Sequence, residues 1–175
     1  MSNKNIVRMC GTEPESIVDG PGFRYVIFVQ GCPHKCPGCH NPQSHDFEAG
    51  YDLSIDELWE DICRSKAVTG ITFSGGEPFC QVEPLLEIAH RAKDAGLDLM
   101  SYSGYTYEQL LDRNDPATNE FLGLMDILVD GPFIEAERNL ELTYRGSENQ
   151  RVIDLNKTRE ADEIVLYRSS FDLDF

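Results

Sequence analysis

Three cysteines stand close together in the first quarter of the chain, and they are the residues best suited to chemistry. Cys32, Cys36 and Cys39 follow the spacing C-x3-C-x2-C. Thiolates hold iron–sulfur clusters, and a [4Fe–4S] cubane usually takes four of them. Three thiolates leave one iron without a protein ligand, and an open coordination position is where a metal centre does chemistry. The spacing therefore predicts a [4Fe–4S] cluster with one open iron.

Two other kinds of metal site remain compatible with this loop. A structural zinc site needs a fourth ligand, which His34, His40 or a distant cysteine could supply. A ferredoxin-type carrier needs a fourth cysteine, and the remaining ones, Cys10, Cys63 and Cys80, have no motif spacing to the first three. A non-enzymatic zinc or electron-transfer module is therefore the alternative to an enzyme.

A second loop suited to binding is Ser74-Gly-Gly-Glu-Pro78. Two glycines let a ligand come close to the backbone. The carboxylate of Glu77 or the backbone carbonyls can accept hydrogen bonds from an ammonium group. Gly75, Gly76 and Glu77 are therefore candidate binding residues.

The segments that must position these loops alternate between strands and helices. A capping box at Ser54–Glu57 begins one helix, an apolar stripe from Leu85 to Ala92 marks a second, and Thr106–Gln109 caps a third. Each unusual loop follows a predicted strand, so the loops are expected to converge on one rim of a parallel sheet. The predicted strands are Phe23–Gln30, Gly70–Phe73, Leu97–Tyr102, Asp126–Val129 and Glu163–Tyr167, and the loops are Gly31–Cys39, Ser74–Pro78, Ser103–Gly104 and Asp130–Pro132.

This alternation predicts an α/β fold with parallel strands. A closed barrel of eight such units takes about 250 residues, and the chain has 175. We therefore expect a partial, open TIM-like β/α barrel that forms a single domain over residues 1–175.

Composition and charge argue against two classes of binding partner, nucleic acids and membranes. The net charge is −16, from 31 acidic and 15 basic residues, which disfavours nucleic acid. No apolar run approaches the roughly 20 residues that span a membrane, and no signal peptide is visible, so we expect a cytoplasmic protein without a membrane partner. Near the cysteines, Arg24, His34 and Lys35 have few acidic neighbours in the sequence, which would suit an anionic cofactor.

The two loops together resemble the radical S-adenosylmethionine (SAM) superfamily. The cysteine spacing resembles its signature, and Ser74–Pro78 resembles its "GGE" loop, which receives the amino group of the methionine part of SAM. The resemblance implies that the open iron chelates the amino and carboxylate groups of SAM, and that Gly38, Cys39 and His40 lie along its adenine. A branched side chain at Gly76 is then expected to weaken SAM binding while iron content stays.

Further segments narrow the resemblance. Val18–Arg24 resembles the activases of glycyl-radical enzymes, and Asp130–Phe133 with Arg145–Arg151 resembles those of anaerobic ribonucleoside-triphosphate reductase. The implied activity is reductive cleavage of SAM and formation of a glycyl radical on that reductase, with electrons from a low-potential donor such as flavodoxin. Arg138, Arg145 and Arg151 are candidates for docking the reductase. Small enzymes resembling 7-carboxy-7-deazaguanine synthases or pyruvate formate-lyase activases remain alternatives.

Overall fold

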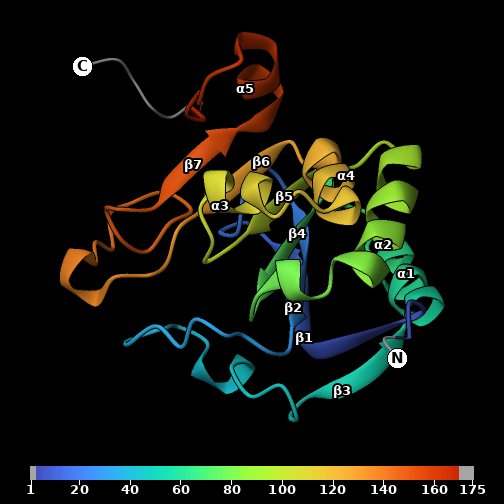
Figure 1. Ribbon diagram of the computed structural model, residues 1–175. Helices are drawn as coiled ribbons and strands as arrows, with labels where there is room; N and C mark the ends of the chain where they lie inside the picture. The colour runs from blue at the N-terminus through green and yellow to red at the C-terminus, as the bar shows by residue number, and fades with distance from the viewer. Residues whose placement is uncertain (1–2, 170–175) are drawn as a thin grey trace.

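One open sheet of seven strands forms the centre of the molecule in the computed structural model, which describes residues 3–169 (Figure 1). The strand order is β3-β1-β2-β4-β5-β6-β7. The strands are β1 (Ile6–Ser16), β2 (Arg24–Val29), β3 (Tyr51–Ser54), β4 (Gly70–Gly75), β5 (Asp98–Tyr102), β6 (Ile127–Asp130) and β7 (Arg151–Asp154). The helices are α1 (Ile55–Arg64), α2 (Val82–Asp94), α3 (Tyr107–Asp112), α4 (Pro116–Leu124) and α5 (Leu155–Ala161).

The four central strands, β2, β4, β5 and β6, run parallel to one another. Antiparallel strands extend both edges, since β1 pairs with β2, β3 with β1, and β7 with β6. The sheet therefore stays open, and the predicted α/β partial barrel is confirmed. Three short 3-10 helices, Pro42–Ser44, Pro78–Cys80 and Glu135–Glu137, lie in the connecting loops.

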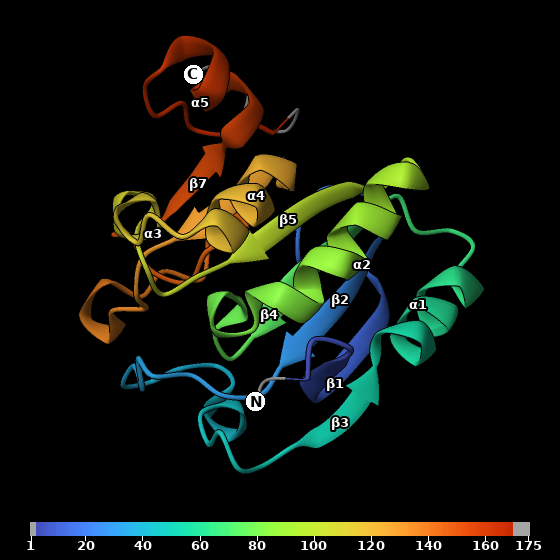
Figure 2. The same ribbon diagram turned by 45° about the vertical axis from the view of Figure 1, so that its right-hand side comes forward.

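Helices α1, α2 and α4 pack together on one face of the sheet (Figure 2). Side chains alternate between the two faces of a strand, so Tyr25, Ile27 and Val29 of β2 enter the large core beneath these helices. The expected caps are present: Ser54 and Glu57 form a reciprocal capping box at α1, and Thr106 and Gln109 form another at α3.

The opposite face of the sheet carries a smaller apolar cluster around Met100, Ile127 and Val129. The β1–β2 loop reaches this face, because the Thr72 hydroxyl donates to the carbonyl of Asp19 over 2.8 Å. The loop's end is held by Arg24, whose side chain is fully buried. Its guanidinium donates to Thr72, Asp98 and the carbonyls of Pro21 and Ile71.

The structure corrects one predicted strand and adds three. Glu163–Tyr167 makes a single bridge, from Leu166 to Ile153 of β7, and is not a strand. Strands β1, β3 and β7 are additional to the sequence prediction. No helix between residues 3 and 169 is long and apolar enough to cross a membrane.

Candidate functional site

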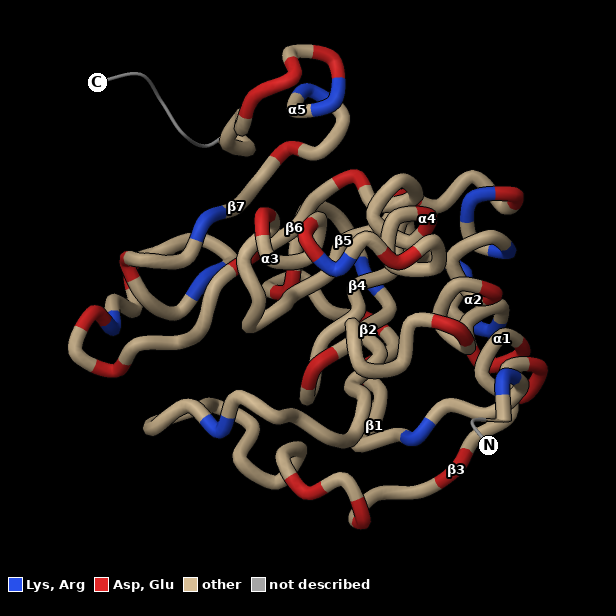
Figure 3. The backbone as a smooth tube through the Cα atoms, in the orientation of Figure 1, with Lys and Arg blue, Asp and Glu red and all other residues tan. Residues whose placement is uncertain are grey.

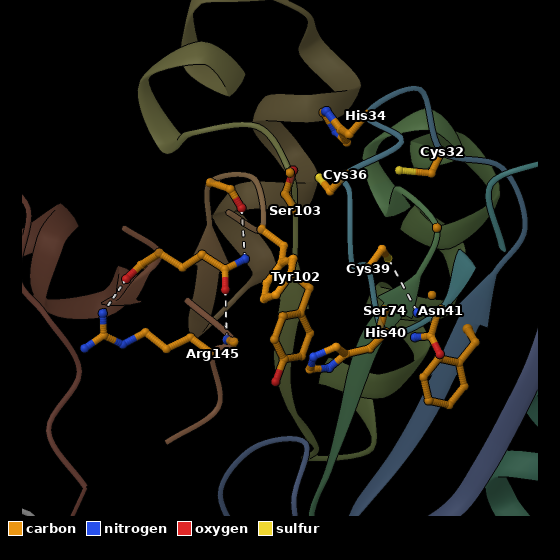
Figure 4. Close-up of a pocket in the computed structure, with 18 of the residues that line it drawn as sticks. Cys32, His34, Cys36, Cys39, His40, Asn41, Ser74, Tyr102, Ser103 and Arg145 are labelled. Carbon is orange, nitrogen blue, oxygen red and sulfur yellow. Dashed lines mark hydrogen bonds between the residues drawn. The ribbon is translucent and has the colours of Figure 1, made fainter. Parts of the chain in front are cut away.

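A cavity of about 360 Å³ lies where the ends of the parallel strands meet (Figure 4). All four loops that the sequence predicts on one rim contribute residues to its lining: the cysteine loop, the glycine loop after β4, the turn after β5, and Gly131 after β6. The predicted convergence is therefore confirmed. In the backbone view coloured by charge, the acidic residues are spread over many elements of the molecule (Figure 3).

The three predicted cluster ligands line this cavity together. Cys32 is buried, Cys36 and Cys39 are partly exposed, and all three are free thiols. The base of their loop is tied down: the Gly31 amide donates to the Ser44 carbonyl over 2.7 Å, and the Cys32 amide donates to the His45 carbonyl over 3.1 Å. The loop ends in a turn in which the amide of Cys39 donates to the carbonyl of Cys36.

The donor set fits an iron–sulfur cluster. The other three cysteines, Cys10, Cys63 and Cys80, do not line the cavity, so the lining offers three thiols and no fourth. Among residues 3–169, no three His, Cys, Asp or Glu side chains surround a single-ion position. Burial raises the pKa of the Cys32 thiol, and the Glu77 carboxylate raises it further, so iron binding has to displace a proton there.

The glycine loop lines the cavity through Ser74, Gly75 and Gly76. Gly75 has φ +94°, a conformation that favours glycine, and a Cβ there would meet the backbone of Val29. Gly76 lies against the carbonyl of Gly31, immediately before the first cysteine. The two predicted binding loops are therefore in direct backbone contact, and the Glu77 amide donates to the same Gly31 carbonyl over 2.9 Å.

Glu77 has a different position from the one its sequence context suggests. Its side chain is fully buried and does not line the cavity, and both carboxylate oxygens already accept hydrogen bonds from the protein. Of the predicted adenine contacts, Cys39 and His40 line the cavity, and the His40 ring lies 5.4 Å from that of Phe133. Gly38 is outside the lining and packs near the carboxylate of Glu135.

One expectation about a positive residue needs correction. Arg24 is buried at the start of β2 and paired with Asp98, so it is not available to an anionic cofactor. Arg145 donates to the carbonyls of Glu148 and Gln150, within its own loop.

Arg151 is also held inside the chain. It pairs with Glu108 and with Asp130, whose side chain is almost fully buried. Arg151 therefore braces the β6–β7 edge and Arg145 braces its own loop, and a role of either in docking the reductase stays a prediction.

Two tyrosines line the cavity that the sequence analysis did not single out. Tyr102 ends β5, and burial and then the charge of Asp19 raise its pKa. Its place at the end of a predicted strand was a usable signal. Tyr144 adopts φ +64°, which is rare for an aromatic residue. No local sequence pattern predicts its place in the cavity lining.

Comparison with known proteins agrees with the site. The model of the 4Fe–4S single cluster domain family matches residues 18–153. An anaerobic ribonucleoside-triphosphate reductase-activating protein of Haemophilus influenzae is 34% identical over 145 residues, covering 78% of this chain and 91% of the relative. The protein of that name from Escherichia coli K12 is 33% identical over 147 residues, covering 79% and 93%.

Two further comparisons cover less of the chain. The pyruvate formate-lyase-activating enzyme of Clostridium pasteurianum is 37% identical over 117 residues, covering 62% of this chain and 49% of that enzyme. Among solved structures, QueE from Escherichia coli aligns with a TM-score of 0.47 at 17% identity, over 58% of this chain and 53% of that one, which is too distant to carry an argument.

The open α/β sheet, the three cysteines at the ends of its parallel strands and the match to the 4Fe–4S single cluster domain family define the class: an iron–sulfur enzyme. The chain belongs to the family of the anaerobic ribonucleoside-triphosphate reductase-activating proteins, which are activases of glycyl-radical enzymes.

Proposed function

We propose that this enzyme uses a [4Fe–4S] cluster on Cys32, Cys36 and Cys39 to cleave SAM reductively, and that its protein substrate is an anaerobic ribonucleoside-triphosphate reductase. The observation that carries the proposal is the meeting of the three cysteines and the glycine loop in one cavity. The anaerobic ribonucleoside-triphosphate reductase-activating proteins, matched over more than 90% of their length, support this choice of partner.

Different residues of the chain would bind different parts of SAM. Three thiolates would bind three irons and leave the fourth for the amino and carboxylate groups of SAM. Gly75 and Gly76 would offer backbone carbonyls to the ammonium, because the Glu77 carboxylate is already fully hydrogen-bonded. Cys39 and His40 would line the adenine, with Gly38 shaping the turn between the ligands.

A reduced cluster bound here would supply the electron for reductive cleavage of SAM, which yields methionine and a 5′-deoxyadenosyl radical able to take hydrogen from a glycine. Tyr102 and Tyr144 line the same cavity as the cysteines and would shield part of it from water. Val18 and Leu142 also line the cavity, and Val18 is 72% exposed. A glycine-bearing loop of the partner would enter past these apolar residues.

The proposal includes three further points. The electron comes from a low-potential donor such as flavodoxin. Residues 1–175 act as one radical SAM domain. The enzyme works in the cytoplasm, which suits six free cysteines, because thiols stay reduced there.

The test is an electron paramagnetic resonance spectrum of the reductase after anaerobic incubation with the reconstituted enzyme, SAM and reductant. A glycyl doublet should appear on the reductase and vanish when its radical-site glycine is replaced by alanine. Cleavage of SAM without a doublet would refute the choice of partner and leave the cluster chemistry standing.

Pyruvate formate-lyase is the second candidate partner, because its activating enzyme from Clostridium pasteurianum matches 62% of this chain. Running both proteins in parallel separates the two. A doublet on the lyase alone would overturn the assignment to the reductase.

A further inference from the structure

We propose that His34 is a positioning residue for the iron–sulfur cluster: by bonding to the buried Glu77, it holds the arc Pro33–Gly38 in the shape that presents the cysteines. The inference deepens the proposed function, and it rests on the cluster assignment and not on the identity of the protein substrate.

Glu77 is the fixed point of this arrangement. Its side chain is fully buried. Oε1 accepts hydrogen bonds from the Phe79 amide over 3.0 Å and from the Ser103 hydroxyl over 2.9 Å. Oε2 accepts from the Gly104 amide and from Nε2 of His34, both over 2.8 Å. The Glu77 carboxylate can only accept hydrogen bonds, so Nε2 of His34 is the donor in this contact.

The arc between the first and third cysteines has no other side-chain hydrogen bond to the rest of the chain. Among the described residues, His34 alone supplies one for positions 33–38. The base of the loop is tied through the amides of Gly31 and Cys32, but Cys36 lies beyond those ties. An arc of this length that loses its one anchor is free to move, and with it the spacing of the three sulfurs.

The anchor also fixes the backbone beside the first ligand. Because Pro33 has no N–H, His34 and Lys35 supply the first backbone N–H groups after Cys32. Lys35 adopts φ +49°, so the backbone turns sharply at this point. Hydrogen bonds to cluster sulfurs help to set the reduction potential, because they stabilise the more negative, reduced form. Fixing the His34 ring therefore fixes the two N–H groups that could make such bonds beside the first ligand.

A second wall holds the imidazole in place. The His34 ring meets the Tyr105 ring edge to face, with centroids 4.4 Å apart. The guanidinium of Arg113 lies 4.5 Å from the centroid of the Tyr105 ring. Gly104 leaves just enough room, because a Cβ there would lie 2.6 Å from Nε2 of His34. The imidazole is thus enclosed by the β4 and β5 loops, and only 15% of its side chain is exposed.

The experiment compares the reconstituted wild type with three variants. His34→Ala removes the anchor. His34→Gln keeps an N–H donor at similar reach. His90→Ala is the matched control, because His90 makes the same kind of contact, 2.7 Å to Glu120, on the exposed surface of the molecule. The readouts are the rate at which a chelator strips iron, the reduction potential of the cluster and its electron paramagnetic resonance spectrum.

For His34→Ala we expect iron loss to become about 10- to 100-fold faster, the usual range for removing an outer-sphere partner of a metal site. The potential should move in the negative direction, and His34→Gln should recover most of both effects. A His34→Ala protein with wild-type iron loss, potential and spectrum would overturn the inference.

Gly104→Ala provides an independent check, since it displaces the imidazole and leaves the sequence of the cysteine loop unchanged. It should accelerate iron loss in the same direction, and a wild-type rate in this variant would contradict the role of the enclosure. If the wild-type chain itself holds no cluster, the proposed function fails. If the wild-type chain holds a cluster and the His34 variants behave as it does, this inference fails and the proposed function stands.

Discussion

Gly76→Ala is the sharpest perturbation of the contact between the two binding loops. A Cβ at this position would lie 2.8 Å from the carbonyl carbon of Gly31 and 3.0 Å from the carbonyl oxygen of Ser44, and closer still to the Gly31 oxygen. Ordinary van der Waals contact begins at 3.4 Å. All three obstacles are backbone atoms, so no side chain can swing aside, and the loop base next to Cys32 must move.

The size of the effect follows from overpacking. Inserting a methyl group into a tightly packed place costs about 1–3 kcal/mol, which is about 5- to 150-fold in an equilibrium. The displaced Gly31 also receives the Glu77 amide and donates to Ser44. We therefore expect Gly76→Ala to reduce bound iron as well as SAM affinity. This revises the expectation from sequence alone, in which iron content stays.

Iron per chain after anaerobic reconstitution and the Kd for SAM by equilibrium dialysis measure the two effects. Gly11→Ala is the control, because a Cβ there has no heavy atom within 4 Å. It should match the wild type in both readouts. Gly76→Ala with full iron and weakened SAM binding would refute the argument that the two loops share one backbone contact.

Three further outcomes are expected. Serine at any of the three loop cysteines should abolish cluster retention, whereas Cys63→Ser, at an exposed site outside the cavity, should keep full iron content. Arg24→Ala should lower the free energy of unfolding by about 1–3 kcal/mol in denaturant titration, because the buried hydroxyl of Thr72 loses its donor, and Arg24→Lys should not recover the contact to Thr72. Ser54→Ala should cost about 1 kcal/mol by the same titration, since it removes the cap of α1, and no change there would contradict the capping assignment.

The parallel centre of the fold could be predicted because its signals are local. Strand β2 is a continuous run of β-branched and aromatic residues, and α1 and α3 begin with capping boxes that need only four residues each. Each of these strands is followed by a loop rich in glycine or cysteine, which predicts four loops on one rim. The cavity lining contains residues from all four loops.

The edges of the sheet could not be predicted in the same way. Strand β1 contains Gly11 and Pro14 and pairs with β2 through two register irregularities, so its alternation is broken in the sequence. Strands β3 and β7 have four residues each and depend on partners that lie far away in the chain. At the other end, Glu163–Tyr167 has a strand-like composition but bridges β7 at a single position.

The gathering of the three cysteines could be predicted from the sequence, but the hydrogen bonds inside the site could not. The cysteine spacing places three thiols in the cavity without any knowledge of the fold. The burial of Glu77 depends on donors from the cysteine loop, from the start of the 3-10 helix after it and from the β5 turn. No local pattern contains those three segments, so the carboxylate looks free in the sequence and is fully engaged in the structure.

The most direct test of the account follows the reduced cluster while SAM is added. In one anaerobic sample, the electron paramagnetic resonance spectrum is recorded before and after addition of SAM, and methionine and 5′-deoxyadenosine are quantified. The account predicts that SAM changes the cluster signal, because it binds the iron that Cys32, Cys36 and Cys39 leave open, and that the two products then form in equal amounts. A cluster signal that SAM leaves unchanged, with neither product formed, would contradict it.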